Sequence, residues 1–264
     1  MNPLALPDSL LSRVEDAGIN ASAPPQQRWV DGWLLRFSPG KAKRARCVQA
    51  VADGRLPLDE RLALCAQVFQ QSGLSMVIRL TPFSRPDGLD GALAARGYGR
   101  LDDTRVMVAP RLPTLADLKA DPLPTNLQLQ PLAAAAFAET VGTLRGSPAG
   151  QRAAQAQRLA LSPVPYQGWV LRRLDDGVAL ACGQTACEAD LVGLYDVFTH
   201  PATRGQGLAR KLCAALLVQA QAAGARVAYL QVEADNTPAR AVYHRLGFAD
   251  GYGYHYRAPD PGAA

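Results

Sequence analysis

Short runs of alternating apolar and polar residues in the second half of the chain predict a mixed series of strands and helices. The turn residues Asp175-Asp176-Gly177 separate two of the predicted strands. Strands are expected at 127–132, 168–174, 178–185, 190–199, 227–233 and 248–257, and helices at 133–144, 148–161, 207–223 and 238–246. Because strands and helices alternate without a long uniform run of either, the pattern indicates an α/β architecture.

Residues at the helix ends refine this prediction. Ser147 is expected to cap the helix that follows it, with Pro148 at the first helical position. Asp235 is a candidate cap for the helix that begins at Pro238, and Gly224 is expected to end the long helix before it.

The first half of the chain repeats part of this order at an offset of 150 residues. Helix 59–71 matches the long helix, strand 77–83 matches strand 227–233, and segment 89–98 matches segment 239–248. Both halves thus end in a helix, a strand, a helix, a Gly-aromatic pair and a strand. Since unrelated α/β domains share such orders, the residues alone leave duplication and coincidence both open.

The length, the composition and the positions of the prolines predict two domains joined by a linker. The 264 residues suggest two domains of ordinary size, and 48% hydrophobic with 19% charged residues is not the composition of a disordered protein. Prolines punctuate the segment between the halves, at Pro110, Pro113, Pro122 and Pro124. We therefore predict a domain at 1–115, a linker with a turn of helix at 116–125, and a domain at 126–264.

Charge and cysteine usage narrow the function classes. The net charge of +5 is mild, and the most basic cluster lacks interleaved aromatic residues, so nucleic acid is not predicted as a partner. That cluster, read as a solvated loop or strand end, is Lys41, Lys43, Arg44 and Arg46. Five cysteines without a C-x-x-C pair predict neither disulfides nor a metal site. No apolar run approaches the roughly 18 residues of a membrane span and the N-terminus lacks signal-peptide features, so a cytoplasmic protein is expected.

The segment Arg204-Gly-Gln-Gly-Leu-Ala209 follows a predicted strand and opens a predicted helix. Glycines let the chain turn tightly, and the first turn of a helix offers N–H groups and a positive dipole end to an anion, typically a phosphate. The segment matches neither a Walker loop nor a complete dinucleotide fingerprint. On these residues alone, a strand-to-helix turn without a ligand is an equal alternative.

The stretch from Val197 to Phe248 resembles the GCN5-related N-acetyltransferase superfamily in two signatures. The first is Val197-Phe-Thr-His-Pro-Ala-Thr-Arg-Gly-Gln-Gly-Leu-Ala209, and the second is Asn236-Thr-Pro-Ala-Arg-Ala-Val-Tyr-His-Arg-Leu-Gly-Phe248. The resemblance covers about residues 126–258. It implies an α/β (α+β) fold with a mixed, mostly antiparallel central sheet flanked by helices, in two tandem copies. It further implies transfer of an acetyl group from acetyl-coenzyme A, as cosubstrate, to a primary amine.

The resemblance assigns roles to individual residues. The backbone beginning at Asp196 would pair with the pantetheine arm, the glycine turn would wrap the pyrophosphate, and Asn236 would hydrogen-bond the cofactor. Tyr243 would protonate the departing thiolate, although packing in the core is its alternative role. The implied cofactor residues are Asp196, Val197, Phe198, Thr199, Arg204, Gly205, Gln206, Gly207, Leu208, Ala209, Arg210, Asn236, Ala239 and Tyr243.

The proton acceptor for the attacking amine is less defined. Glu233 and Asp196 are the candidates, with a surface or capping role as the alternative for each. His200 and His244 are interpreted as structural or exposed. In the first half, Gly54–Asp59 stands in place of the glycine turn and Leu93 in place of Tyr243, so a single active site is predicted.

Two alternatives to an enzyme remain on the sequence. A non-catalytic acyl-coenzyme A sensor would keep the glycine turn without depending on Tyr243, and a partner-binding protein would leave the turn empty. The acceptor, a small molecule or a protein amine, and the oligomeric state are not predicted.

Overall fold

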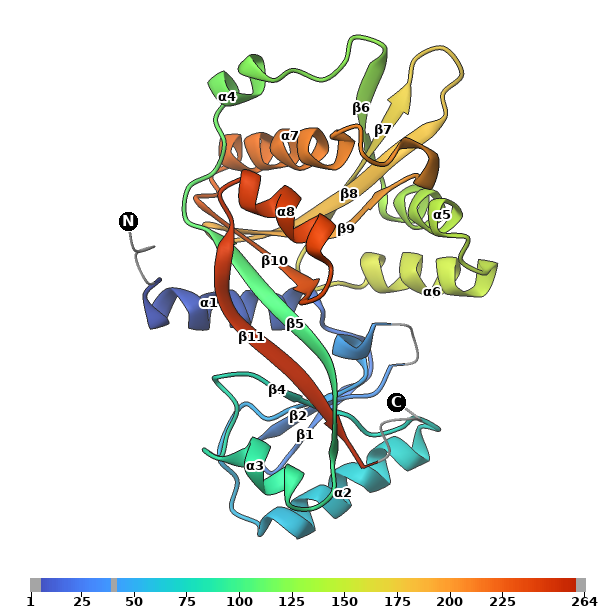
Figure 1. Ribbon diagram of the computed structural model, residues 1–264. Coiled ribbons are helices and arrows are strands. Elements are labelled where there is room, and N and C mark those ends of the chain that lie inside the picture. Colours follow the sequence, from blue (N-terminus) through green and yellow to red (C-terminus); the bar gives the residue numbers. More distant parts are fainter. Residues whose placement is uncertain (1–5, 39–41, 260–264) are drawn as a thin grey trace. The chain divides into compact units, whose positions relative to one another are not determined.

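A computed structural model describes residues 6–38 and 42–259, which group into two compact units (Figure 1). Unit 1 contains residues 6–21, 106–232 and 236–251. Unit 2 contains residues 22–38, 42–105, 233–235 and 252–259. Lys41 and the first five residues lie outside the described part of the chain.

Unit 1 is a sheet covered by helices. Its strands are β6 (Leu127–Leu132), β7 (Tyr166–Arg173), β8 (Ala179–Glu188), β9 (Leu191–Thr199) and β10 (Val227–Glu233). Its helices are α1 (Asp8–Ala21), α4 (Leu115–Ala120), α5 (Ala134–Arg145), α6 (Ala149–Ala160), α7 (Leu208–Ala222) and α8 (Thr237–Arg245). The strand order is β10-β9-β8-β7-β6, antiparallel except for the parallel pair β9 and β10.

Two apolar clusters hold these helices to the sheet. Leu212 and Leu216 of α7 are fully buried with Leu194 of β9 in the larger cluster. Phe137 of α5 leads the smaller cluster, and its side chain lies so close to Gly168 of β7 that a Cβ there would stand 2.7 Å from it. The glycine thus permits close approach of helix and strand. Burial of each such aromatic or leucine side chain contributes about 1.5–3 kcal/mol.

Unit 2 contains the remaining strands. The strands β1 (Gln27–Val30), β2 (Trp33–Arg36), β3 (Val48–Gln49) and β4 (Ile78–Leu80) lie in sequence order, followed by β11 and β5. The helices are η1 (Lys43–Ala45), α2 (Leu58–Gln71) and α3 (Leu89–Ala94). Its core includes Trp33, Phe69, Ile78 and Leu93.

The long strands β5 (Gly99–Ala109) and β11 (Ala249–Ala258) each contribute residues to both units. The last strand of each predicted half is therefore divided between the two units. The boundaries of the compact units differ for this reason from the predicted ranges 1–115 and 126–264, which stay a prediction about how the sequence is organised. The element starts nevertheless keep the offset of 150: α2 begins at Leu58 and α7 at Leu208.

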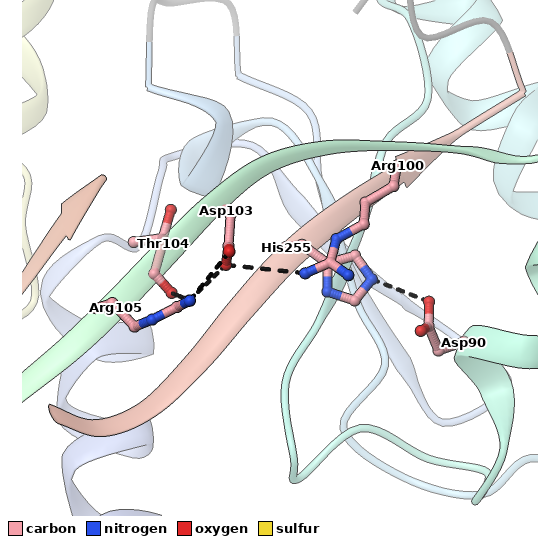
Figure 2. Close-up of polar contacts among 6 residues, drawn as sticks. All are labelled: Asp90, Arg100, Asp103, Thr104, Arg105 and His255. Atoms are coloured by element: carbon pink, nitrogen blue, oxygen red, sulfur yellow. Dashed lines mark hydrogen bonds and ion pairs between the residues drawn. The ribbon is translucent and has the colours of Figure 1, made fainter. Parts of the chain in front are cut away.

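Polar contacts fix β11 within unit 2, and Figure 2 shows the one between His255 and Asp90. Nε2 of His255 lies 2.9 Å from Oδ1 of Asp90, and Nε of Arg257 donates to the same oxygen. Burial acts to raise the pKa of Asp90, but the hydrogen bonds and charges of Arg257 and His255 outweigh it and hold that pKa below its usual range. The contact therefore stabilises unit 2 near neutral pH, and the contribution is lost as acid protonates Asp90.

The structure corrects both predicted N-terminal helix caps. Pro148 is the N-cap of α6 and not its first residue, while the backbone N–H of Ser147 donates to Gly142 O at the end of α5. Ser147 thus closes the preceding helix and does not cap the next one. Helix α8 is capped by Asn236, not Asp235, because Oδ1 of Asn236 accepts the N–H of Ala239 at 3.2 Å.

The basic cluster is also different from the solvated loop that we expected. Lys43 forms a 3.0 Å ion pair with Asp102, and Arg44 donates to the hydroxyl of Tyr254 at 3.3 Å.

None of the helices within residues 6–38 and 42–259 is both long and apolar enough to cross a membrane.

Candidate active site

The glycine turn lies between β9 and α7, as the sequence predicted. After a short 3-10 helix at Pro201–Thr203, the chain reaches Gly205 at φ 79° and Gly207 at φ 72°, both left-handed. Gly207 is the N-cap of α7 without a side-chain cap, and a Cβ on either glycine would meet nothing within 4 Å. The start of α7 therefore has open space beside its two glycines, through which an anion could approach the first N–H groups of the helix.

The cations near this turn have different partners. Arg210 and Lys211 form ion pairs with Asp121, which lies in the predicted linker. Hydrogen bonds from Lys211 and Arg210 lower the pKa of Asp121. Arg204 instead stacks over the ring of Phe198, 5.5 Å from Cζ to the centroid. Any phosphate at the turn would meet the backbone and Arg204 first, and would compete with Asp121 for the other two.

Strand β9 separates from β10 partway along its length. Their parallel pairing joins Leu191–Leu194 to Val227–Leu230, while β9 continues to Thr199. On the other side, β9 slips against β8: Tyr195 faces Gln184, but Phe198 faces Cys182. Two residues of β9 thus oppose one of β8, which defines a β-bulge. In the described structure the β10-side edge of residues 196–199 has no strand partner.

Asp196 sits in this bulge at φ +49°, an uncommon conformation for a residue other than glycine. Its carboxylate accepts three hydrogen bonds. Oδ1 accepts from Nη1 of Arg145 at 2.8 Å, and Oδ2 accepts from Nε2 of Gln155 at 3.0 Å and Nε2 of Gln184 at 2.7 Å. The sequence predicted the place of Asp196 on the cofactor strand but gave no sign of these partners.

Tyr243 is packed and partly buried on α8. Its ring meets Phe248 edge to face with centroids 6.0 Å apart, and it borders the large apolar cluster of unit 1 with Ala239. Burial, with a smaller effect from the Cys213 thiol, raises the pKa of Tyr243 above its ordinary value. The packing and the proposed catalytic role are therefore compatible, because the phenol stays protonated over a wide pH range.

The remaining predicted polar residues have local roles or face solvent. Asn236 is exposed and its Oδ1 caps α8, so its amide nitrogen is left to donate to a cofactor. Glu233 is the exposed last residue of β10. The ring nitrogens of His200 and His244 bond to Ala202 N and Phe248 O, in keeping with the structural role expected for both.

The matching place in unit 2 holds an internal anion. Oδ1 of Asp31 accepts the N–H of Arg55 at 2.9 Å, and Oδ2 accepts the N–H of Leu56 at 3.0 Å. Nε of Arg61 completes the contact at 2.9 Å, and a Cβ on Gly54 would stand 2.1 Å from Oδ2. A carboxylate of the chain itself thus accepts the N–H groups that precede α2. At the offset of 150 residues, this segment corresponds to the glycine turn of unit 1.

We predict that Asp31→Asn lowers the melting temperature at pH 7 by several degrees. Backbone hydrogen bonds from Arg55 and Leu56, the largest effect, together with Arg61, lower the pKa of Asp31. A lowered folded-state pKa gives stability that is present above about pH 4 and is lost as pH falls further. The melting difference between variant and wild type should therefore shrink in acid.

Thermal melts across pH 3–7 check this prediction, with Asp53→Asn as the control in the same loop, because Asp53 is exposed. Equal melting of Asp31→Asn and wild type at pH 7 would contradict the role assigned to this carboxylate.

Comparison with known proteins agrees with this geometry. Residues 136–248 match the sequence model of the acetyltransferase (GNAT) family. The chain is 26% identical over 232 residues to the uncharacterised N-acetyltransferase YobR of Bacillus subtilis, covering 88% of this chain and 91% of that protein.

Solved structures share the fold. A GCN5-related N-acetyltransferase from Kribbella flavida superposes with a TM-score of 0.64 at 19% identity, covering 95% of both chains. A tandem GNAT protein from the clavulanic acid biosynthesis pathway gives 0.60 at 14%, covering 81% of this chain and 76% of that one. The predicted fold class, a mixed and mostly antiparallel sheet flanked by helices, is confirmed. Residues 136–248 are thus similar in sequence to the acetyltransferase (GNAT) family, and the chain shares the fold of solved GCN5-related N-acetyltransferases.

Proposed function

We propose that this protein transfers an acetyl group from acetyl-coenzyme A directly to a primary amine. The observation that carries the proposal is the separation of β9 from β10 at Asp196, a few residues before the glycine turn. The unpaired edge of β9 offers N–H and C=O groups to the amides of a pantetheine arm, as an added strand would use them. The turn offers N–H groups to the pyrophosphate at the end of that arm.

The chemistry needs no nucleophile on the protein. The amine nitrogen attacks the thioester carbon, the C–S bond breaks, and the sulfur leaves as a thiolate that takes the proton of the Tyr243 hydroxyl. The nitrogen loses its proton to a carboxylate or to water. The raised pKa of Tyr243 keeps its hydroxyl protonated, so the proton for the thiolate is present at neutral pH.

The two candidate proton acceptors differ in their surroundings. Both carboxylate oxygens of Asp196 are held by donors, whereas Glu233 is exposed. We therefore treat Asp196 as a residue that shapes β9, and leave proton acceptance to water or to another carboxylate. The amine is a small molecule or a protein amine, and the duplicated element order supports a tandem protein with one active unit.

Two measurements on the full chain test this proposal. Calorimetric titration should show one acetyl-coenzyme A per chain, and thiol release should depend on an added amine from a panel of polyamines, amino acids, aminoglycosides and peptides. Heat of binding without thiol release for any amine would favour the sensor, the second candidate, because the turn alone would explain it. No heat and no thermal shift would reject both.

A further inference from the structure

The bulge that opens β9 is held by side chains from three other elements. Arg145 is the last residue of α5, Gln155 lies in the middle of α6, and Gln184 lies on β8. All three donate to the carboxylate of Asp196. We propose that these three are positioning residues, which clamp Asp196 in its left-handed conformation and so keep the edge of β9 open for the acyl donor. This inference rests on the proposed function.

The backbone conformation explains why a clamp is needed. A residue with a side chain is strained at φ +49°, by an amount that the surrounding structure must offset. Asparagine, aspartate and glycine tolerate this region best. The Asp196 carboxylate adds three hydrogen bonds that form only when β9 bulges, and one donor carries a charge, which strengthens its bond. Without them, regular pairing would favour an unbulged β9.

Burial shows that the clamp is built into the fold. Gln184 is 1% exposed, so its amide cannot turn to water when the bond to Asp196 is lost. Leaving such a buried donor unpaired is unfavourable. Arg145 and Gln155 reach the same carboxylate from the helices that cover this face of the sheet, so the position of Asp196 is fixed from three directions.

The clamp also reaches the glycine turn. Arg145 stacks over the ring of Phe198 with Cζ 5.5 Å from the centroid, and Arg204 stacks on that ring at the same distance. Nε of Arg204 further donates to Thr199 O at 3.4 Å. Phe198 therefore joins the residue that holds Asp196 to the first residue of the turn. Loosening the clamp should lower affinity for acetyl-coenzyme A as well as turnover.

Replacing Gln155 by leucine is the first test, because Gln155 is only partly buried and the variant should fold. We expect kcat to fall about tenfold, the order that backbone strain of this kind represents. Hydrogen–deuterium exchange in residues 195–199 should quicken. Gln157→Leu is the matched control, the same change at an exposed position of the same helix, and should match wild type in both readouts.

Two substitutions at Asp196 separate a clamp from a proton acceptor. Glycine adopts positive φ without strain, so Asp196→Gly should keep more activity than Asp196→Ala, and Gln155→Leu should have little further effect in the glycine background. Equal losses for both, with a missing limb in the pH–rate profile, would show that Asp196 is the proton acceptor and overturn the proposal. Wild-type kcat and exchange in Gln155→Leu would overturn it too.

The exchange readout keeps the two proposals apart. If wild type releases no thiol with any amine, the proposed function fails. Faster exchange of residues 195–199 in Gln155→Leu would still support the clamp, and unchanged exchange would still reject it.

Discussion

Tyr243→Phe should lower kcat by about a hundredfold while leaving the affinity for acetyl-coenzyme A unchanged. The phenylalanine ring keeps the contact with Phe248, whose centroid lies 6.0 Å away, so the fold should hold. What the variant loses is the proton for the departing thiolate. Single-turnover acetyl transfer, calorimetry and thermal melts on the same preparation separate rate, affinity and stability.

The pH dependence sharpens this expectation. Burial and the neighbouring Cys213 raise the pKa of Tyr243 above the ordinary value near 10. Since the acid form is the active one, the wild-type rate should show no decline from Tyr243 ionisation up to about pH 10. Tyr98→Phe is the control, a half-buried tyrosine of unit 2. Near wild-type turnover in Tyr243→Phe would assign this tyrosine to packing alone and favour the sensor.

Local sequence patterns were sufficient to predict most of the helices and strands of the second half. Helix α7 begins at Leu208 and strand β10 spans Val227–Glu233, within one residue of the expectation, because strong periodicity and a flanking glycine mark them. The Ser147 cap failed where two helices meet. Ser147 is a good cap by type, yet its N–H is engaged by the helix before it, which sequence position alone does not reveal.

The sequence predicted those parts of the candidate site that are formed by one continuous segment of the chain. Gly205 and Gly207 have positive φ in the turn that the sequence indicated. The partners of Asp196 were not predictable, because Arg145 lies 51 residues away and makes no local pattern with it. The contact between Asp121 and Lys211 of α7 was equally unpredictable, because the two residues lie 90 positions apart. Contacts of this kind depend on tertiary packing, which one sequence does not disclose.

The exchange of β5 and β11 between the units was hidden for a related reason. A strand's apolar pattern reports that one face is buried and does not name its neighbour. The offset of 150 residues nevertheless pointed to equivalent elements, and the structure adds what replaced the turn in the first half. Asp31 supplies a carboxylate where the second half leaves N–H groups open. This contrast supports one cofactor site per chain.

Gly207→Ala should lower the affinity for acetyl-coenzyme A by about tenfold, or 1.4 kcal/mol. A Cβ at Gly207 points into open space in the protein, so it would touch a bound ligand rather than the chain. A phosphate that approaches the first N–H groups of α7 closely would be displaced by it. The φ of 72° adds a cost of roughly 1 kcal/mol to folding, which thermal melts would register separately.

Gly88→Ala is a close control, because Gly88 is the N-cap of α3 at φ 74° and ψ 7°, against 72° and 7° for Gly207. Both glycines have open surroundings, so both alanine variants should lose similar stability. Only Gly207→Ala should weaken binding in calorimetry. Equal weakening in both variants would mean that the loss comes from general destabilisation. Unchanged binding in both would place the pyrophosphate away from the turn, and the cofactor assignment of Arg204 to Ala209 would then be wrong.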